Sequence, residues 1–151
     1  MDYETELYLT SLREKQPEWV GKLEMYAKDN HVPIMEPLGI DFLMQIIRMK
    51  KPDKILEIGT AIGYSALRMV TAYPSTRIVT IERDRTRYKE ALDNIEQYSN
   101  ENIIEVMFGD ALEISEKVKA KGPFDLLFID AAKGQYNRFF DLYTPFLQDD
   151  A

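Results

Sequence analysis

The chain has 151 residues, of which 19 are Lys or Arg and 26 are Asp or Glu, so its formal net charge is −7. This charge excludes a protein that coats nucleic acid with a generally basic surface. The absence of cysteine excludes disulfides, thiolate nucleophiles and Cys-ligated metals. An acidic N-terminal end and the lack of an apolar run of about 18 residues favour a cytoplasmic protein without a membrane partner.

Residues 1–50 are expected to form an N-terminal helical segment, and residues 51–151 an α/β core within one domain. Apolar side chains recur at helical spacing behind Pro17 and behind Pro37, and the apolar loop 31–36 joins the two helices. Short apolar runs, typical of strands buried on both faces, cover residues 55–58, 78–81, 103–108 and 124–129. Segments long enough for crossover helices cover residues 65–73, 84–98, 111–118 and 135–147. This alternation predicts a Rossmann-type fold, a mostly parallel sheet with helices on both faces.

Acidic residues stand at the ends of the predicted strands. The second strand ends at Glu82, the third is followed by Asp110 and the fourth by Asp130. Ligands of open α/β sheets bind beyond the carboxyl ends of the strands, so these carboxylates are expected to surround a binding site.

A glycine turn follows the first strand, but it departs from the dinucleotide fingerprint. Ala61 takes the place of the middle glycine between Gly59 and Gly63, which makes a pyrophosphate nest less favourable. Glu82 is placed to accept hydrogen bonds from a ribose diol. An acidic rim repels a phosphate-rich cofactor and attracts the sulfonium of S-adenosylmethionine (SAM), so SAM is favoured over NAD.

Four segments carry a family resemblance: residues 56–66, 80–83, 109–112 and 128–133. They resemble the cation-dependent O-methyltransferases of the catechol and caffeoyl-CoA type, which implies a class I methyltransferase fold. Within that family, loop 31–36 and residues 133–136 resemble enzymes that convert 5-hydroxyuridine at the tRNA wobble position to 5-methoxyuridine.

The resemblance implies roles for individual residues. Asp130 would bind a divalent cation, usually Mg²⁺, which lowers the pKa of the acceptor hydroxyl and directs it. Lys133 would act beside that hydroxyl as general base or anchor, so Lys133 and Asp130 are the expected catalytic pair. The family also suggests a homodimer. The implied cofactor-binding residues are Met35, Glu57, Gly59, Thr60, Gly63, Ser65, Glu82, Arg83, Asp110, Ala111 and Asp130.

The same resemblance implies a further strand with an Asp-Asn pair of metal ligands beyond Leu147. We therefore expect residues 1–151 to be a single, incomplete, C-terminally truncated methyltransferase domain with an exposed sheet edge. Three alternatives stay open: a methyltransferase of small catechol-like acceptors, a catalytically impaired cofactor-binding fragment that pairs with a partner, and a nucleotide-dependent oxidoreductase.

Overall fold

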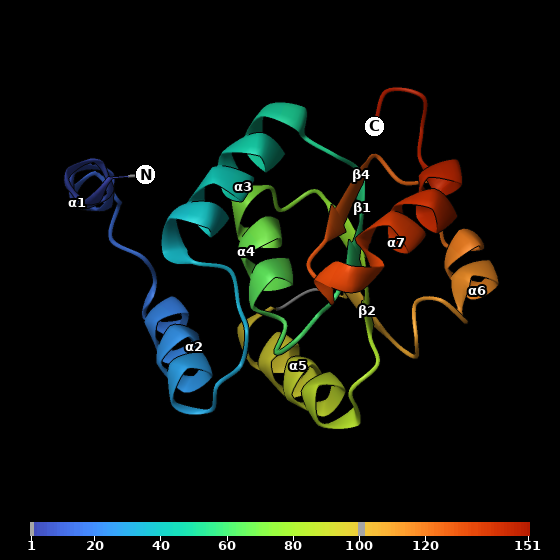
Figure 1. Cartoon of the computed structure of the whole chain (residues 1–151), viewed down its shortest axis with the longest axis horizontal. Coiled ribbons are helices and arrows are strands. Elements are labelled where there is room, and N and C mark those ends of the chain that lie inside the picture. The colour runs from blue at the N-terminus through green and yellow to red at the C-terminus, as the bar shows by residue number, and fades with distance from the viewer. Residues whose placement is uncertain (1, 100–101) are drawn as a thin grey trace.

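The computed structural model describes residues 2–99 and 102–151, which form a four-stranded sheet with helices on both of its faces (Figure 1). The strands are β1 (Lys54–Ile58), β2 (Arg77–Glu82), β3 (Ile104–Phe108) and β4 (Leu126–Ile129). The α-helices are α1 (Tyr3–Ser11), α2 (Glu18–Asp29), α3 (Pro37–Lys50), α4 (Tyr64–Ala72), α5 (Arg85–Tyr98), α6 (Ser115–Lys119) and α7 (Tyr136–Tyr143). Two short 3₁₀ turns flank α7, namely η1 (Lys133–Gln135) and η2 (Thr144–Phe146).

The sheet has the strand order β3-β2-β1-β4, and all of its pairs are parallel. The chain moves from β1 outward to β3 and then returns to pair β4 with the other side of β1. In the register, Ile58 lies beside Ile81 on one side and beside Ile129 on the other. The strand order therefore reverses between β1 and β4, and their carboxyl ends form the switch point where ligands of such folds bind. The predicted Rossmann-like fold is confirmed.

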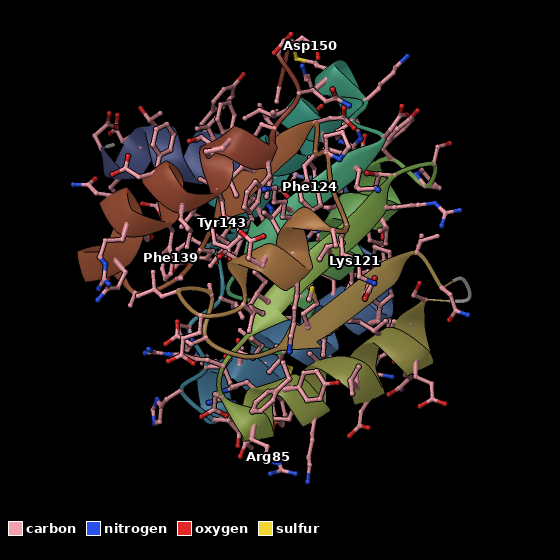
Figure 2. The ribbon with its side chains drawn as sticks, turned by 90° about the vertical axis from the view of Figure 1, so that its right-hand side faces the viewer. Arg85, Lys121, Phe124, Phe139, Tyr143 and Asp150 are labelled. Atoms are coloured by element: carbon pink, nitrogen blue, oxygen red, sulfur yellow. The ribbon has the colours of Figure 1, made fainter. Side chains whose placement is uncertain are left out.

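Two hydrophobic clusters hold the layers together. Helices α2, α3, α4 and α5 lie on one side of the sheet, and α6 and α7 lie on the other (Figure 1). Successive residues of β1 point to opposite faces of the sheet. Ile55 packs into the first hydrophobic cluster, and Leu56 packs into the second. In the second cluster, Phe139 and Tyr143 of α7 gather against Phe124, whereas Arg85 lies at the far end of the molecule (Figure 2).

Some boundaries differ from the sequence predictions. The helix expected at 111–118 is only the five residues of α6, because Asp110 first closes a turn with its side chain and carbonyl. The last helix ends at Tyr143 and continues as a 3₁₀ turn that contains Pro145, which cannot donate a helical hydrogen bond. Phe124 precedes β4 and makes an isolated bridge to Leu147.

Helix α1 packs least against the rest of the protein. Asp2 caps it by accepting a hydrogen bond from the Thr5 amide at 2.9 Å, but none of its side chains is buried. Over residues 2–99 and 102–151, no helix has the length and apolar character needed to cross a membrane.

Candidate functional site

A cavity of about 570 Å³ opens at the carboxyl ends of the four strands. Each of the four strands lines the cavity with residues at its carboxyl end or directly after it. The strand-end residues that line the cavity are Ile58, Gly59, Ile81, Glu82, Gly109, Asp110, Asp130 and Ala131. The acidic strand ends predicted from the sequence are thus brought together at the switch point.

Gly59 makes the close approach of β1 to β4 possible. Its φ of 103° lies in the region that glycine favours, and a Cβ at this position would lie 2.0 Å from the backbone oxygen of Asp130. The Asp130 amide in turn donates to the Ile58 carbonyl at 2.9 Å. Gly59 therefore allows the backbone after β1 to contact the backbone after β4 at the edge of the cavity.

Glu82 is held by two backbone amides at the end of β2. Its Oε2 accepts from the Ala61 amide and its Oε1 from the Asp84 amide, both at 2.8 Å. A carboxylate has about four acceptor sites, so each oxygen can still accept a hydroxyl proton from a ribose diol. Ala61 has a φ of 49°, and its amide is used by Glu82 instead of being free for a pyrophosphate.

The wall beyond β3 is formed by Asp110 and Ala111. Asp110 Oδ1 accepts from the Leu112 amide at 2.8 Å, which closes the turn. The buried hydroxyl of Tyr143 donates to the Ala111 carbonyl at 2.6 Å and ties this turn to α7. Both predicted residues line the cavity, as does Arg83 beside Glu82.

Glu57, one of the expected cofactor-binding residues, does not line the cavity. It is fully buried beneath the glycine turn, where it accepts hydrogen bonds from Ser65 Oγ and, at 2.6 Å, from Thr80 Oγ1. Thr60 Oγ1 lies 2.6 Å from Thr80 Oγ1 and completes the cluster. Burial raises the pKa of Glu57 to about 7, although the two hydroxyl donors oppose that rise. Glu57 therefore positions the turn from below.

Gly63 does not line the cavity either. It takes a φ of 82° at the start of α4, and its Cα faces the side chain of Ile95 on α5. Gly63 therefore allows α4 to pack closely against α5.

A smaller hollow adjoins the main cavity between the glycine turn and loop 31–36. Thr60 and Ser65 line it from one side, and Met35 from the other. The expected cofactor-binding residues Met35, Gly59, Thr60, Ser65 and Asp130 thus share one hollow, which Ile34 and Tyr64 also line.

Asp130 and Lys133 both line the cavity near β4, and desolvation raises the pKa of Asp130. Within residues 2–99 and 102–151, no three His, Cys, Asp or Glu side chains come close enough to hold a metal ion. Proteins often bind Mg²⁺ through one or two carboxylates together with waters and substrate oxygens, so a cation at Asp130 stays a prediction.

Two aromatic residues of α7 that line the cavity were not predicted as site residues. Tyr136 and Phe139 line the cavity three positions apart on one helix face, and Arg87 lines it from α5. The sequence pattern assigns this aromatic run to core packing. Phe139 does both, because it is also buried in the second cluster. Their position three and six residues after Lys133 is the signal that could have identified Tyr136 and Phe139.

The family profile described as O-methyltransferase matches residues 10–149. The chain belongs to this O-methyltransferase family. A catechol O-methyltransferase of Niastella koreensis is 33% identical over 102 residues, which are 66% of this chain and 46% of that protein. A caffeoyl-CoA O-methyltransferase of Stellaria longipes is 27% identical over 134 residues, 84% of this chain and 56% of its own length. The chain thus spans about half the length of these curated relatives.

Solved structures of the family share the fold. A Staphylococcus aureus protein named as a candidate caffeoyl-CoA O-methyltransferase is 40% identical, with a TM-score of 0.87 over 95% of this chain and 68% of that one. The O-methyltransferase TomG of Streptomyces achromogenes, solved with SAM, is 27% identical, with a TM-score of 0.84 over 96% of this chain and 67% of its own.

Proposed function

We propose that this chain binds SAM and takes part in transferring its methyl group to a hydroxyl oxygen. Glu82 is the observation that carries the proposal. Its carboxylate is fixed at the end of β2 with acceptor sites left for a ribose diol, while the adjacent Ala61 amide is engaged. This arrangement suits a cofactor with a ribose and no phosphate, and membership of the O-methyltransferase family supports it.

The cavity suggests how the reaction proceeds. Methyl transfer from a sulfonium is an in-line displacement, in which the new O–C bond forms as the S–C bond breaks and the hydroxyl loses its proton. Asp130 and Lys133, which both line the cavity after β4, are proposed to orient the hydroxyl and receive that proton. A divalent cation stays a prediction that needs oxygen ligands besides Asp130.

We further propose that the acceptor is 5-hydroxyuridine in tRNA. The similarity of loop 31–36 to enzymes with that substrate supports it. Arg83 and Arg87 supply basic groups at the cavity, next to a site that must admit a nucleotide of an anionic polymer. The alternative acceptor, a small catechol-like phenol, needs no such groups.

Mass spectrometry separates these acceptors. The protein is incubated with SAM and tRNA that carries 5-hydroxyuridine, and in parallel with SAM and catechol. We expect 5-methoxyuridine in the tRNA and no methylated catechol. Methylated catechol without 5-methoxyuridine would replace the tRNA proposal with the alternative, and no product in either reaction would refute both acceptors.

Homodimer formation and a cytoplasmic location, where tRNA is present, complete the proposal. Exposed apolar side chains on one face of α3, Phe42, Ile46 and Met49, support self-association. Sedimentation velocity at increasing protein concentration tests it, and a constant monomer sedimentation coefficient would refute it.

A further inference from the structure

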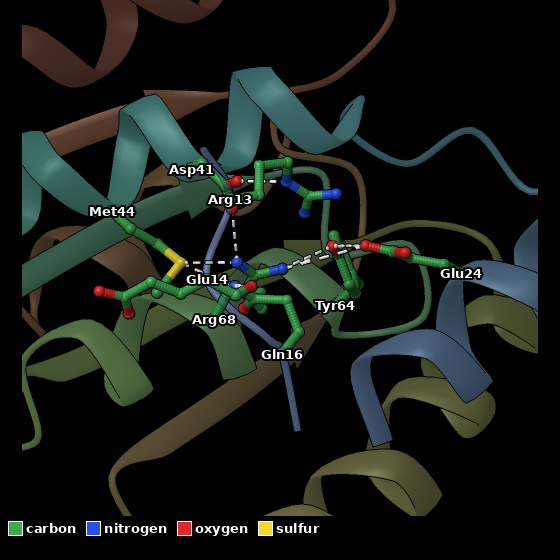
Figure 3. Close-up of polar contacts among 8 residues, drawn as sticks. All are labelled: Arg13, Glu14, Gln16, Glu24, Asp41, Met44, Tyr64 and Arg68. Atoms are coloured by element: carbon green, nitrogen blue, oxygen red, sulfur yellow. Dashed lines mark hydrogen bonds and ion pairs between the residues drawn. The ribbon is translucent and has the colours of Figure 1, made fainter. Parts of the chain in front are cut away.

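Arg68 of α4 lies at the centre of a buried polar network that joins three helices (Figure 3). Its side chain is 1% exposed, yet its guanidinium has partners on several sides. Nη2 donates to Asp41 Oδ1 at 2.8 Å and to Met44 Sδ at 2.9 Å, and Nη1 donates to the Tyr64 hydroxyl at 2.8 Å. A buried charge is costly unless it is paired, so this number of partners explains how Arg68 is accommodated.

The network extends to α2 through Tyr64. The Tyr64 hydroxyl accepts from Arg68 and donates to Glu24 Oε1 at 2.6 Å, so it uses both of its hydrogen-bonding capacities. The Arg68 guanidinium also lies 4.0 Å from Glu24 and 5.6 Å from the centre of the Tyr64 ring. Helix α2 is thereby attached to the first turn of α4.

Asp41 of α3 is shared by two arginines. Besides Arg68, it accepts from Arg13 Nε at 2.5 Å, which ties the segment before α2 to the same point. Burial by itself would raise the pKa of Asp41, but the hydrogen bonds and charges of Arg13 and Arg68 hold it below its ordinary value. Asp41 thus stays ionised and keeps α3 attached to α4.

Glu24 and Asp41 connect the Arg68 network to the loop that borders the site. Glu24 on α2 and Asp41 on α3 lie on either side of loop 31–36 in the chain, and both are bound to α4. Helix α4 begins directly after the glycine turn. Both helices that carry the loop are therefore fixed to the helix that carries the turn, and the loop and the turn form the two sides of the smaller hollow.

We propose that Arg68 is a positioning residue that holds Ile34 and Met35 of the loop against the glycine turn, so that the loop borders the amino-acid portion of the cofactor. Arg68 itself lines neither hollow; it acts through Tyr64, Asp41 and the helices they anchor. The inference rests on the proposed SAM site and adds a structural cause for the shape of its methionine end.

The test compares SAM with adenosine, which lacks the sulfonium, its methyl group and the amino-acid portion that the loop would border. SAM fills both ends of the site, whereas adenosine lacks the amino-acid portion and reaches only the ribose and adenine end. Binding of each to the wild type and to Arg68→Met is measured by calorimetry, at a temperature where circular dichroism shows the variant folded. We expect SAM affinity to fall about tenfold in Arg68→Met, because Ile34 and Met35 would then have to be immobilised when SAM binds. Adenosine affinity should stay within about twofold of the wild-type value.

Three further variants make the test specific. Arg68→Lys keeps the charge and should recover part of the SAM affinity, and Asp41→Asn is a milder disruption if Arg68→Met does not fold. Tyr26→Phe is the matched control. It removes the 2.6 Å hydrogen bond from the Tyr26 hydroxyl on α2 to Glu90 on α5, which lies outside the Arg68 network. It should leave SAM affinity unchanged.

Hydrogen exchange adds a readout without ligand. We expect faster amide exchange in loop 31–36 of Arg68→Met and unchanged exchange in β1 and β2. Unchanged SAM binding in Arg68→Met, or equal losses of SAM and adenosine, would overturn the inference while leaving the proposed function in place. A wild type that binds no SAM would overturn both.

Discussion

Replacing Glu57 with glutamine should remove a pH dependence of stability that the buried carboxyl imposes on the wild type. Glu57 is fully buried and bonded to Ser65 and Thr80, and burial raises its pKa from 4.5 to about 7. Glutamine has nearly the same shape as the protonated acid and does not titrate. The Glu57→Gln protein therefore resembles the low-pH form of the wild type at every pH.

The sign and size follow from proton linkage. The pKa of Glu57 is 4.5 in the unfolded protein and about 7 in the folded protein, so between these pH values the folded protein binds more protons at Glu57. The stability that Glu57 contributes is therefore fully present below pH 4.5 and is lost as the pH rises through about 7. Integrating between about pH 5 and about pH 8 gives a loss of about 2.5 kcal/mol in the free energy of unfolding for this group.

Urea unfolding of both proteins at several pH values between these limits measures the effect. We expect the wild type to lose about 2.5 kcal/mol relative to Glu57→Gln as the pH rises across this range. Glu105→Gln, which removes an exposed carboxylate of β3 and its surface ion pair with Lys121, serves as the control and should follow the pH dependence of the wild type, because exposed ion pairs contribute little to stability. Parallel pH profiles for the wild type and Glu57→Gln would refute the raised pKa and the buried position behind it.

Further substitutions test the turns around the cavity. Gly59→Ala places a Cβ 2.0 Å from the Asp130 oxygen at a φ of 103°, so we expect a loss of at least about 2 kcal/mol by urea unfolding. Gly134→Ala has open space around its new Cβ and should change stability by less than about 0.5 kcal/mol, and equal effects of the two would contradict the close approach. Tyr143→Phe leaves the Ala111 carbonyl without its 2.6 Å partner and should cost about 1–2 kcal/mol in thermal unfolding; an unchanged melting temperature would show that this bond contributes nothing.

Much of the sheet and of the cavity rim could be predicted from the sequence because both follow from local patterns. The strands 55–58 and 78–81 were predicted to within one residue, since strands buried on both faces are continuous apolar runs. The acidic residues at the ends of the predicted strands were expected to meet at one edge of the sheet, because parallel strands end on the same side. Glu82, Asp110 and Asp130 do meet there.

The remaining features depend on partners far away in the chain. Glu57 was expected at the ligand, but its direction is set by hydroxyls of β2 and α4. Arg68 gave no signal at all, since a charged residue in an amphipathic helix is normally assigned to the solvent. Its burial depends on Asp41 and Glu24, 27 and 44 positions earlier in the sequence.

Titration of the protein with SAM and with NAD tests the nature of the cavity most directly. We expect SAM to bind, NAD to give no heat, and Glu82→Gln to weaken SAM binding roughly tenfold or more, as loss of a charged acceptor for two hydroxyls requires. Binding of NAD without SAM, or SAM binding that is unaffected by Glu82→Gln, would contradict a SAM site built around Glu82.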